Sequence, residues 1–476
     1  MAAEKRSTPP GACFEGTDRS VISVPASMFT AGVPPRDPQP TLLRLANQLA
    51  KLNGEALRRF GATAAVRTSA NGTFLDISTG TTIGALPLLS PTTARPDYGL
   101  VIRPRFEWRG IGPMMGDMGF RVVPSILPLP ALPRSDRSIP QWVLSSVVLP
   151  RIERLLRGLN RQFEMRSDLQ TAPKGRVDWG SWATQHLSRG AFLRVPCTYP
   201  ALQEDRRLLA GLHYTLRLHL DSLESQRSAG SVVVHLVDFC RNLIGQVSHV
   251  APAPASAGAI AAWVHGRLQS PGWADGVEAI EWAAERRGLA GMSDLRGIPW
   301  QLEMEEFFEA WVETVVSRLA PSIGARVQAG RLRQTQSPLQ WEPPYEGSQR
   351  YLLPDVVMQR DDVSFVFDAK YKQHWEELNS SGWTRLEEIV KERHRTDLLQ
   401  VLAYSTLFST PKVVCVLVYP CRRDTWESLK SRGRLVHRAS VASGHRDVSL
   451  LLTAVPFGVT AREAADTLAE ITVSVA

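Results

Sequence analysis

The chain has 476 residues, 43% of them hydrophobic and 21% charged, and no run of about eighteen apolar residues could span a membrane. This length predicts about two or three domains, and the net charge of +8 suits a polyanionic partner. The five cysteines are scattered without a CxxC pair, so neither a disulfide framework nor a zinc ribbon is indicated. The first residues show no apolar stretch after their basic residues, which predicts a cytoplasmic protein without a secretory signal.

The N-terminal third divides into two segments of different composition. Residues 1–40 are rich in Pro, Gly and Ser, which predicts a loosely ordered arm. In residues 41–148, leucines at helical spacing predict a helix over 41–60. Alternating apolar residues on either side of Asn71-Gly72 predict two strands that follow this helix. We therefore expect a mixed α+β domain over 41–148.

A glycine-rich stretch, RGIGPMMG, lies within this domain. Its spacing does not match a dinucleotide-binding loop, and Pro113 removes a backbone donor, so we interpret it as a turn. No glycine loop is followed by GKS or GKT, which indicates that the chain carries no Walker-type nucleotide site. Any nucleotide-driven motor would therefore be a separate polypeptide.

The middle region, residues 149–295, is predicted to be mainly helical. Over 149–163 the apolar residues share one face of an amphipathic helix, and arginines occupy the other face. These arginines could track the phosphates of DNA, although a solvated face is an open alternative. They are Arg151, Arg154, Arg157 and Arg161. We place a domain boundary near residue 296.

The most informative stretch is residues 351–375, YLLPDVVMQRDDVSFVFDAKYKQHW. Two runs of β-branched and aromatic residues, 352–358 and 363–367, flank a polar turn at 359–362. This pattern predicts a β-hairpin.

Acids and amines gather at one end of this hairpin. Asp355 lies on the first strand, and the second strand ends in a DxK sequence. Because side chains alternate along a strand, Asp368, Lys370 and Lys372 should point to one side. Two carboxylates on adjacent strands suit Mg²⁺, with Mn²⁺ as a substitute, and a nearby amine can orient or deprotonate the attacking water. The arrangement suits phosphodiester hydrolysis; the alternative is a strand end with surface Asp and Lys residues.

The basic residues of the chain are strongly biased, with 8 Lys against 47 Arg. A position that needs only positive charge would therefore usually hold Arg, yet residues 370 and 372 are both Lys. Lysine differs from arginine in that its pKa shifts readily, whereas arginine stays protonated. This bias favours a chemical role over a generic charge.

The pairing of Pro354-Asp355 with Asp368-Ala369-Lys370 resembles the PD-(D/E)xK nuclease signature. The longer run, LLPDVVM followed by FVFDAKYK, is similar to the McrC family of modification-dependent restriction subunits. The segment VVCVLVYP further on resembles the next strand of that family.

This resemblance implies a fold and a set of roles. The C-terminal domain, 296–476, would be an α/β nuclease fold with a mixed central sheet flanked by helices. Asp355 and Asp368 would bind Mg²⁺ with the carbonyl of Ala369, and Lys370 would handle the attacking water.

A downstream helix also resembles the family. The segment DLLQVLAY matches a helix that carries a Gln and a Tyr four residues apart, here Gln400 and Tyr404. Spacing of four places both on one helical face, and the resemblance implies that they position the site. Asp397 and Gln400 also fit a helix N-cap and its partner, so an ordinary capping role stays open.

An upstream helix completes the resemblance. MEEFFEAWVETVV resembles the helix before the hairpin, and its site acid would be Glu309. Glu309 lies in a row of helical carboxylates, and such a row is commonly a solvated face. Both interpretations stay open.

We therefore expect a Mg²⁺-dependent DNA endonuclease subunit of a bacterial antiphage defence or restriction complex, without a membrane partner. Lys372 and the arginines of the 149–163 helix would contact DNA. The resemblance implies a separate McrB-like AAA+ NTPase or helicase motor, with the domain over 41–148 docking a partner or binding DNA. The alternatives are a non-catalytic adaptor, which activates an AAA+ motor and uses the nuclease fold as a DNA platform, and a structural helical scaffold.

Overall fold

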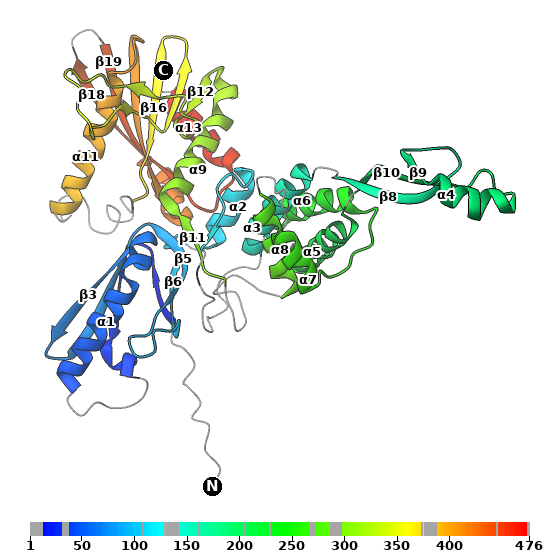
Figure 1. Ribbon diagram of the computed structural model, residues 1–476. Helices are drawn as coiled ribbons and strands as arrows, with labels where there is room; N and C mark the ends of the chain where they lie inside the picture. The colour runs from blue at the N-terminus through cyan, green and yellow to red at the C-terminus, as the bar shows by residue number, and fades with distance from the viewer. Residues whose placement is uncertain are drawn as a thin grey trace. The chain divides into compact units, whose positions relative to one another are not determined.

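The computed structural model describes residues 13–30, 38–106, 108–127, 129, 142–159, 162–203, 205–227, 230–265, 272–285, 298–372, 375, 388–443 and 446–473 (Figure 1). The chain forms two compact units, which are Met1–Ser146 with Gln226–Leu236 and Gly288–Ala476 (unit 1), and Val147–Ser225 with Val237–Arg287 (unit 2). The N-terminal and C-terminal parts of the chain thus belong to one unit. We had expected them to form separate domains that follow one another along the chain. The boundary that we expected near residue 296 lies outside the described residues.

The N-terminal part of unit 1 combines small sheets with helices. Its elements are β1 (Cys13–Thr17), β2 (Val21–Pro25), η1 (Ala26–Thr30), α1 (Pro38–Arg59), β3 (Ala62–Ser69), β4 (Gly72–Thr79), β5 (Thr82–Leu88), β6 (Tyr98–Arg103), α2 (Trp108–Asp117) and β7 (Ser125–Ile126). Strands β2, β4 and β3 form an antiparallel sheet, and α1 packs on it through Leu45 and Leu49. The predicted helix over 41–60 and the two strands on either side of Asn71-Gly72 are therefore confirmed.

Residues 13–30 are folded, although we expected them to belong to a loosely ordered arm over 1–40. β1 pairs in parallel with β6, and β2 pairs antiparallel with β4. Phe14 and Phe29 are buried and contact the ring of Tyr98 on β6. This aromatic packing stabilises the segment in spite of its Pro- and Gly-rich surroundings, so the arm prediction is wrong here.

The glycine-rich stretch RGIGPMMG forms helix α2, so its interpretation as a turn is wrong. Pro113 lies inside this helix. A Cβ atom added to Gly112 would lie 3.0 Å from Trp142 Cζ2 and 3.1 Å from Val232 Cγ1. The glycine is therefore explained by close packing between helices, which the local sequence does not reveal.

A strand from the C-terminal part joins the N-terminal sheet. β11 (Trp300–Glu303) lies between β5 and β7 in the strand order β1-β6-β5-β11-β7. Gly84 of β5 has a φ of 145°, and a Cβ atom there would lie 2.1 Å from the carbonyl oxygen of Trp300. This close approach requires glycine and ties the two ends of the chain into unit 1.

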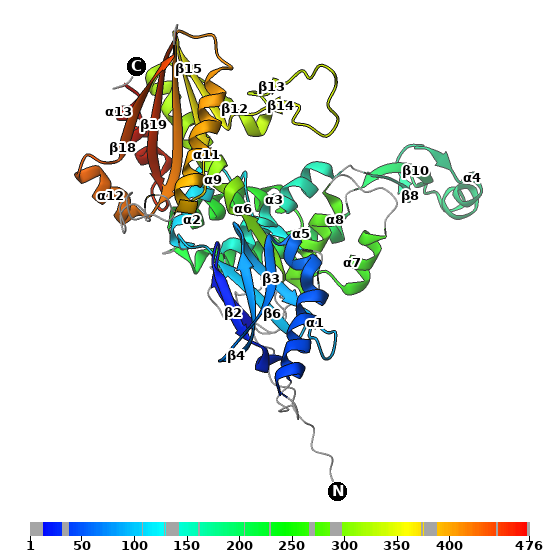
Figure 2. The same cartoon turned by 90° about the vertical axis from the view of Figure 1, so that its left-hand side faces the viewer.

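The C-terminal part of unit 1 is built on a six-stranded mixed sheet of order β12-β15-β16-β17-β19-β18 (Figure 2). Its elements are α9 (Met304–Leu319), η5 (Ala320–Ile323), β12 (Arg326–Ala329), η6 (Gly330–Leu332), β13 (Ser337–Pro338), β14 (Tyr351–Leu352), β15 (Val356–Arg360), β16 (Val363–Ala369), α11 (Glu388–Ser405), β17 (Lys412–Cys421), α12 (Arg423–Ser431), β18 (Val436–Ser443), β19 (Arg446–Pro456) and α13 (Ala461–Val473). β16, β17 and β19 run parallel, and β17, which contains the segment VVCVLVYP, is buried along almost its whole length. Helix α9 packs on β15 and β16, and α11 packs on β16 and β17. The expected mixed α/β architecture is therefore present.

Unit 2 contains helices and a three-stranded sheet. Its elements are the greater part of α3 (Trp142–Gly158), β8 (Gln162–Gln170), β9 (Arg176–Val177), α4 (Trp179–Ser181), η2 (Trp182–His186), η3 (Leu187–Arg189), β10 (Val195–Gln203), α5 (Arg206–Glu224), most of α6 (Ser231–Val247), α7 (Ala257–Val264) and α8 (Trp273–Ala284). Figure 1 shows β8 and β10 as a long antiparallel ribbon. The helix expected over 149–163 ends at Gly158, and Phe163 belongs to β8, so the predicted helix is too long. No helix among the described residues has both the length and the apolar content to cross a membrane.

Candidate active site

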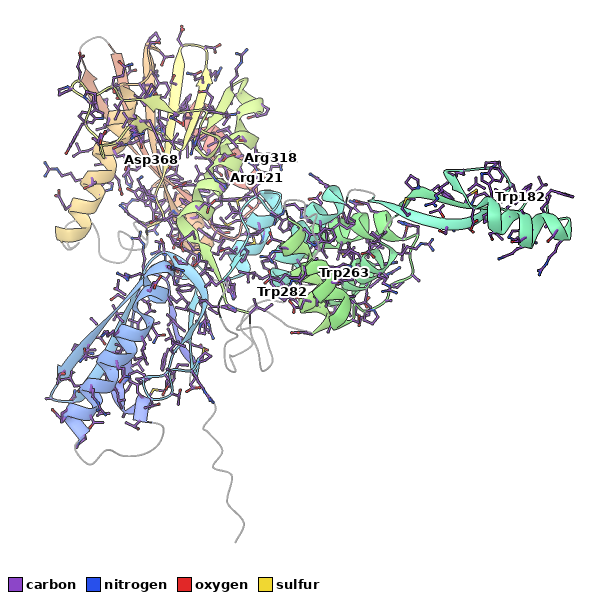
Figure 3. The ribbon with its side chains drawn as sticks, viewed as in Figure 1. Arg121, Trp182, Trp263, Trp282, Arg318 and Asp368 are labelled. Carbon is purple, nitrogen blue, oxygen red and sulfur yellow. The ribbon has the colours of Figure 1, made fainter. Side chains whose placement is uncertain are left out.

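The hairpin of β15 and β16 is the centre of the candidate site. The two strands pair antiparallel around Asp361 and Asp362, which confirms the predicted hairpin. The first strand is shorter than expected, since Tyr351 and Leu352 belong to β14 and pair with β13 instead. Asp355 therefore lies immediately before β15, while Asp368 lies within β16 (Figure 3).

Direct contacts join the two acids and the amine of this motif. Asp355 Oδ2 accepts a hydrogen bond of 2.8 Å from the backbone N of Ala369. Lys370 Nζ lies 3.1 Å from Oδ1 and 2.9 Å from Oδ2 of Asp368, whose side chain is 1% exposed. The structure thus brings together Asp355, Asp368, Ala369 and Lys370.

The backbone around Asp355 is held from the neighbouring strand end. Thr335 Oγ1 donates to the carbonyl of Pro354 at 2.6 Å, and the N of Gly330 donates to the carbonyl of Asp355 at 2.7 Å. A Cβ atom on Gly330 would lie 2.5 Å from the Pro354 carbonyl oxygen, so glycine permits this close approach. The position of Asp355 is therefore defined by tertiary contacts as well as by the hairpin.

Three carboxyl groups share this region. Burial raises the pKa of Asp355 well above its ordinary value, and the charges of Asp368 and Glu309 raise it further. Burial also raises the pKa of Asp368, which the adjacent Lys370 only partly opposes. The pKa of Glu309 is raised by burial too, with Lys370 opposing it and Glu305 and Asp368 adding to it. Clustered, partly desolvated acids of this kind are typical of sites that hold a cation or a proton.

The surroundings of Lys370 favour its protonated form. Burial alone would lower the pKa of Lys370, but the charges of Asp368 and Asp355, with a hydrogen bond to Asp368, outweigh it and raise the pKa. The amine is therefore positively charged in the structure. This state suits holding and orienting a water or phosphate oxygen better than removing a proton.

Glu309 stands apart from the other acids of α9. Glu305 and Glu306 are exposed and pair with Arg19 and Arg331, in agreement with a solvated helical face. Glu309 is half-buried, and the charges that act on it include Lys370 and Asp368 at the end of the hairpin as well as Glu305 and Arg331. The structure therefore places Glu309 near the site, in agreement with the interpretation of Glu309 as a site acid.

Lys372 belongs to a second ion pair beside the site. Its Nζ lies 2.6 Å and 2.7 Å from the two carboxylate oxygens of Asp397. Tyr419 of β17 donates a hydrogen bond of 3.1 Å to Asp397 Oδ2, and His394 Nδ1 lies 3.2 Å from the Tyr419 hydroxyl. This pairing argues against the expectation that Lys372 contacts DNA. Sequence reasoning missed Tyr419 and His394, although a tyrosine within an apolar strand was a usable signal.

Helix α11 supplies further side chains. Since α11 begins at Glu388, Asp397 and Gln400 lie in its interior, and the capping interpretation is wrong. Gln400 Nε2 donates a hydrogen bond of 2.9 Å to the hydroxyl of Tyr404. Burial raises the pKa of the Tyr404 hydroxyl, and the charge of Asp368 raises it further, whereas the hydrogen bond from Gln400 lowers it. Tyr404 is buried on the helix that packs on β16 and β17.

The donor atoms fit a hard divalent cation. Within the described part of the chain, no group of three or more His, Cys, Asp or Glu side chains is arranged to hold a metal ion. Mg²⁺ does not require such a group, because it is commonly bound by one or two carboxylates and keeps several waters. Asp368 Oδ2 is buried and accepts no hydrogen bond, and its ion-pair contact is the ammonium of Lys370 at 2.9 Å, so this oxygen keeps lone-pair capacity for such an ion.

The arginines of α3 have partners within unit 2. Their ion pairs are Arg151–Glu278 (2.8 Å), Arg154–Asp275 (3.6 Å) and Arg157–Glu153 (2.6 Å). The side chain of Arg151 is 13% exposed and also lies over the ring of Trp282, which leaves little surface for a phosphate. Arg161 lies outside the described residues.

The raised pKa values predict how stability depends on pH. Asp355 and Asp368 bind protons more tightly in the folded than in the unfolded state, so their contribution is present below the unfolded pKa and is lost as pH rises through the folded pKa. In chelator, the urea concentration at the unfolding midpoint should decrease as pH rises above the ordinary range of carboxyl pKa values, and Asp355→Asn should reduce this decrease. Asp76→Asn is the control, because a hydrogen bond from Arg67 lowers the pKa of Asp76 and gives the opposite sign. A profile unchanged by Asp355→Asn would contradict the electrostatic account.

Comparison with known proteins finds a family that is similar to the part of the chain around this site. Residues 292–420 match the family described as "McrBC 5-methylcytosine restriction system component", a segment that includes α9, the β15–β16 hairpin and α11. No curated protein matches the chain. The resemblance inferred from the hairpin motif is therefore confirmed for this segment.

Two solved structures from Thermococcus gammatolerans are also similar. A chain in a half-complex from the tetradecameric assembly of McrB AAA+ hexamers with bound McrC is 14% identical, with 96% of this chain and 100% of that chain covered and a TM-score of 0.44. A chain in the cryo-EM structure of the McrBC complex is 11% identical, with 64% of this chain and 87% of that chain covered and a TM-score of 0.27.

Proposed function

We propose, because residues 292–420 match the McrBC restriction family, that this protein is the McrC-like DNA endonuclease subunit of a restriction or antiphage defence complex. The observation that carries the proposal is the contact set of Asp355, Asp368 and Lys370 on one hairpin. Fold and family alone do not establish chemistry, so the proposal depends on these side chains.

The C-terminal part of unit 1 would then be a PD-(D/E)xK nuclease fold. The order of elements, with a helix before the hairpin and a helix and parallel strand after it, supports this assignment. Helices α9 and α11 both pack on β16, the strand that carries Asp368. Each helix thus brings a polar side chain toward the same strand.

The chemistry would be Mg²⁺-dependent hydrolysis of a DNA phosphodiester bond. The ion, with Mn²⁺ as a substitute, would lower the pKa of a water and neutralise charge that develops on the phosphate. Asp355 and Asp368 would hold it through carboxylate oxygens, with the carbonyl of Ala369. The buried Asp368 oxygen without a hydrogen bond is the feature of this chain that fits such a role.

The remaining side chains would bind and orient the substrate. Lys370, charged and in contact with Asp368, would hold the attacking water or the scissile phosphate by its ammonium group. Tyr404, oriented by Gln400, would donate to a phosphate oxygen, and Glu309 would add negative charge that retains the cation. Water exclusion by the packed helices would strengthen each of these interactions.

The complex would include a separate motor. The chain has no Walker-type loop, so it cannot hydrolyse nucleotide by that mechanism. One similar structure contains McrB AAA+ hexamers with bound McrC, which makes a McrB-like AAA+ NTPase the partner that we propose. DNA would be the substrate of the assembled complex.

A non-catalytic adaptor is the second candidate function. It is favoured by the closeness of the Lys370 ammonium to both oxygens of Asp368, at 3.1 Å and 2.9 Å, because that contact already neutralises the carboxylate. Such a protein would activate the motor and use the fold as a DNA platform. It would not need to bind a divalent ion.

Metal binding separates the two functions. Titration of the full-length chain with Mn²⁺ in a calorimeter should show a saturable site, and Asp355→Asn/Asp368→Asn should remove it because both carboxylate ligands are lost. Glu313→Gln is the control, since Glu313 is a buried acid of the same unit that pairs with Arg121. The wild-type complex should also cut plasmid DNA in Mg²⁺. A chain that binds no ion and a complex that cuts no DNA would support the adaptor.

A further inference from the structure

A buried ion pair lies behind the candidate site, between residues of the N-terminal strands. Asp18 follows β1 and Arg105 follows β6, and their side chains are 0% and 6% exposed. Arg105 Nε lies 3.2 Å from Asp18 Oδ2, and the backbone N of Arg105 donates to Asp18 Oδ1 at 2.7 Å. Strands β1 and β6 pair in parallel up to Thr17 and Arg103, so Asp18 and Arg105 both follow the same end of this strand pair.

The same arginine contacts the strand that carries the candidate catalytic amine. Arg105 Nη2 donates a hydrogen bond of 3.1 Å to the carbonyl of Tyr371, and its guanidinium carbon lies 4.3 Å from the centre of the Tyr371 ring. Tyr371 follows β16 between Lys370 and Lys372; its ring packs near Phe308, whereas the two lysines pair with Asp368 and Asp397. Arg105 therefore holds the backbone at the point where the two lysines diverge.

Aromatic packing fixes this contact. Phe106 stacks on Phe457 at 4.7 Å between ring centres, and both rings pack against Tyr371. Phe308 of α9, next to Glu309, also contacts Tyr371. The N-terminal strands, α9 and the end of β16 thus meet around one tyrosine.

Burial of a charged pair needs an explanation beyond stability. Removing two charges from water is unfavourable, and apolar residues of similar volume commonly stabilise a fold equally well. An arginine, however, can direct several donors from one planar group, toward Asp18 and Tyr371 together. A pair of apolar residues in place of Asp18 and Arg105 could not donate the hydrogen bond to the Tyr371 carbonyl.

We propose that Arg105, oriented by Asp18, is a positioning residue that fixes the backbone of Lys370–Lys372 and so keeps the Lys370 amine against Asp368. The consequence for DNA cleavage rests on the proposed nuclease function, whereas the consequence for the backbone does not. A displacement of the β1–β6 strand pair would break the contact and withdraw the amine. The N-terminal part of the chain would in this way control the activity of the C-terminal part.

Amide hydrogen exchange on the full-length protein tests the backbone effect without metal or DNA. The amides of Lys370 and Lys372 donate to the carbonyls of Val418 and Lys370, so their exchange reports on this segment. In Asp18→Leu/Arg105→Met, which leaves no unpaired charge, both amides should exchange about tenfold faster at an unchanged melting temperature. Arg105→Lys, which keeps a charge beside Asp18 but not the planar fork, should not restore protection.

The control is a second ion pair of the same unit, away from Tyr371. Arg121, labelled in Figure 3, lies 2.7 Å from Glu313, and Arg121→Met/Glu313→Leu should leave exchange at residues 370–372 unchanged. In the assembled complex, the Asp18 and Arg105 double variant should lower kcat for DNA cleavage about tenfold with KM unchanged.

The outcomes separate this inference from the nuclease proposal. Wild-type exchange and kcat in a folded Asp18→Leu/Arg105→Met protein would overturn the positioning role. A wild-type complex that does not cut DNA would overturn the nuclease function, while the exchange comparison would still decide whether Arg105 holds the segment. If exchange at residues 370–372 is also faster in Arg121→Met/Glu313→Leu, the effect is a general loss of stability in unit 1, and the positioning role of Arg105 is overturned.

Discussion

Asp368→Asn should reduce the rate of plasmid cleavage by the assembled complex about a thousandfold or more in Mg²⁺. Asp368 is buried on β16, touches Lys370 with both oxygens and supplies a carboxylate that Asn replaces with a neutral amide. The loss of one anionic ligand weakens binding of the ion and leaves Lys370 without its partner. Because Asn is nearly isosteric, the fold should be retained.

The measurement is the initial rate of conversion of supercoiled plasmid, with DNA binding and melting temperature recorded for each protein. Glu313→Gln is a matched control, since it neutralises another buried acid of unit 1, one whose ion pair is with Arg121, and it should cut at close to the wild-type rate. If Asp368→Asn and wild type cut equally fast, Asp368 is not a catalytic residue and the nuclease proposal loses its main support.

Lys370→Met should lower the cleavage rate about a hundredfold to a thousandfold, with little change in DNA affinity. Burial lowers the pKa of Lys370, but the neighbouring carboxylates raise it by more. The side chain therefore stays an ammonium group in contact with Asp368. Methionine fills a similar volume but cannot hold a water or a phosphate oxygen. Lys370→Arg should also be slow, because a guanidinium differs in shape and donor directions from an ammonium at this largely buried position.

Lys372→Met provides the comparison within the same segment. Lys372 is bound by Asp397 at 2.6 Å and 2.7 Å, so its loss should reduce stability and leave most of the cleavage rate. Single-turnover rates at saturating DNA, measured beside unfolding curves, distinguish the two lysines. Equal losses of rate for both variants would mean that the ion pairs act only by supporting the fold.

Much of the candidate site follows from local sequence. Alternation and turn chemistry predict the β15–β16 hairpin, and the DxK order places Asp368 and Lys370 on one side of it. These predictions are confirmed because each depends only on the pattern of a few neighbouring residues, which can be read from the sequence.

Predictions that depended on composition alone were less successful. The glycine-rich stretch around Pro113 forms helix α2, in which Gly112 allows close packing against the side chains of Trp142 and Val232. Residues 13–30 fold because Phe14 and Phe29 pack with an aromatic residue of β6. In both cases the deciding contact comes from a distant part of the chain, and single-sequence reasoning has no access to it.

The sequence by itself determined the hairpin, its acids and its amines, since strand alternation and side-chain chemistry are properties of neighbouring residues. Only the tertiary structure decided which partner each charge takes: Asp397 for Lys372, Asp368 for Lys370, and the Tyr371 carbonyl for Arg105. Such pairings join residues up to 266 positions apart. They form because a charge removed from water must find a partner within the fold, and the packing of strands and helices settles which partner is within reach.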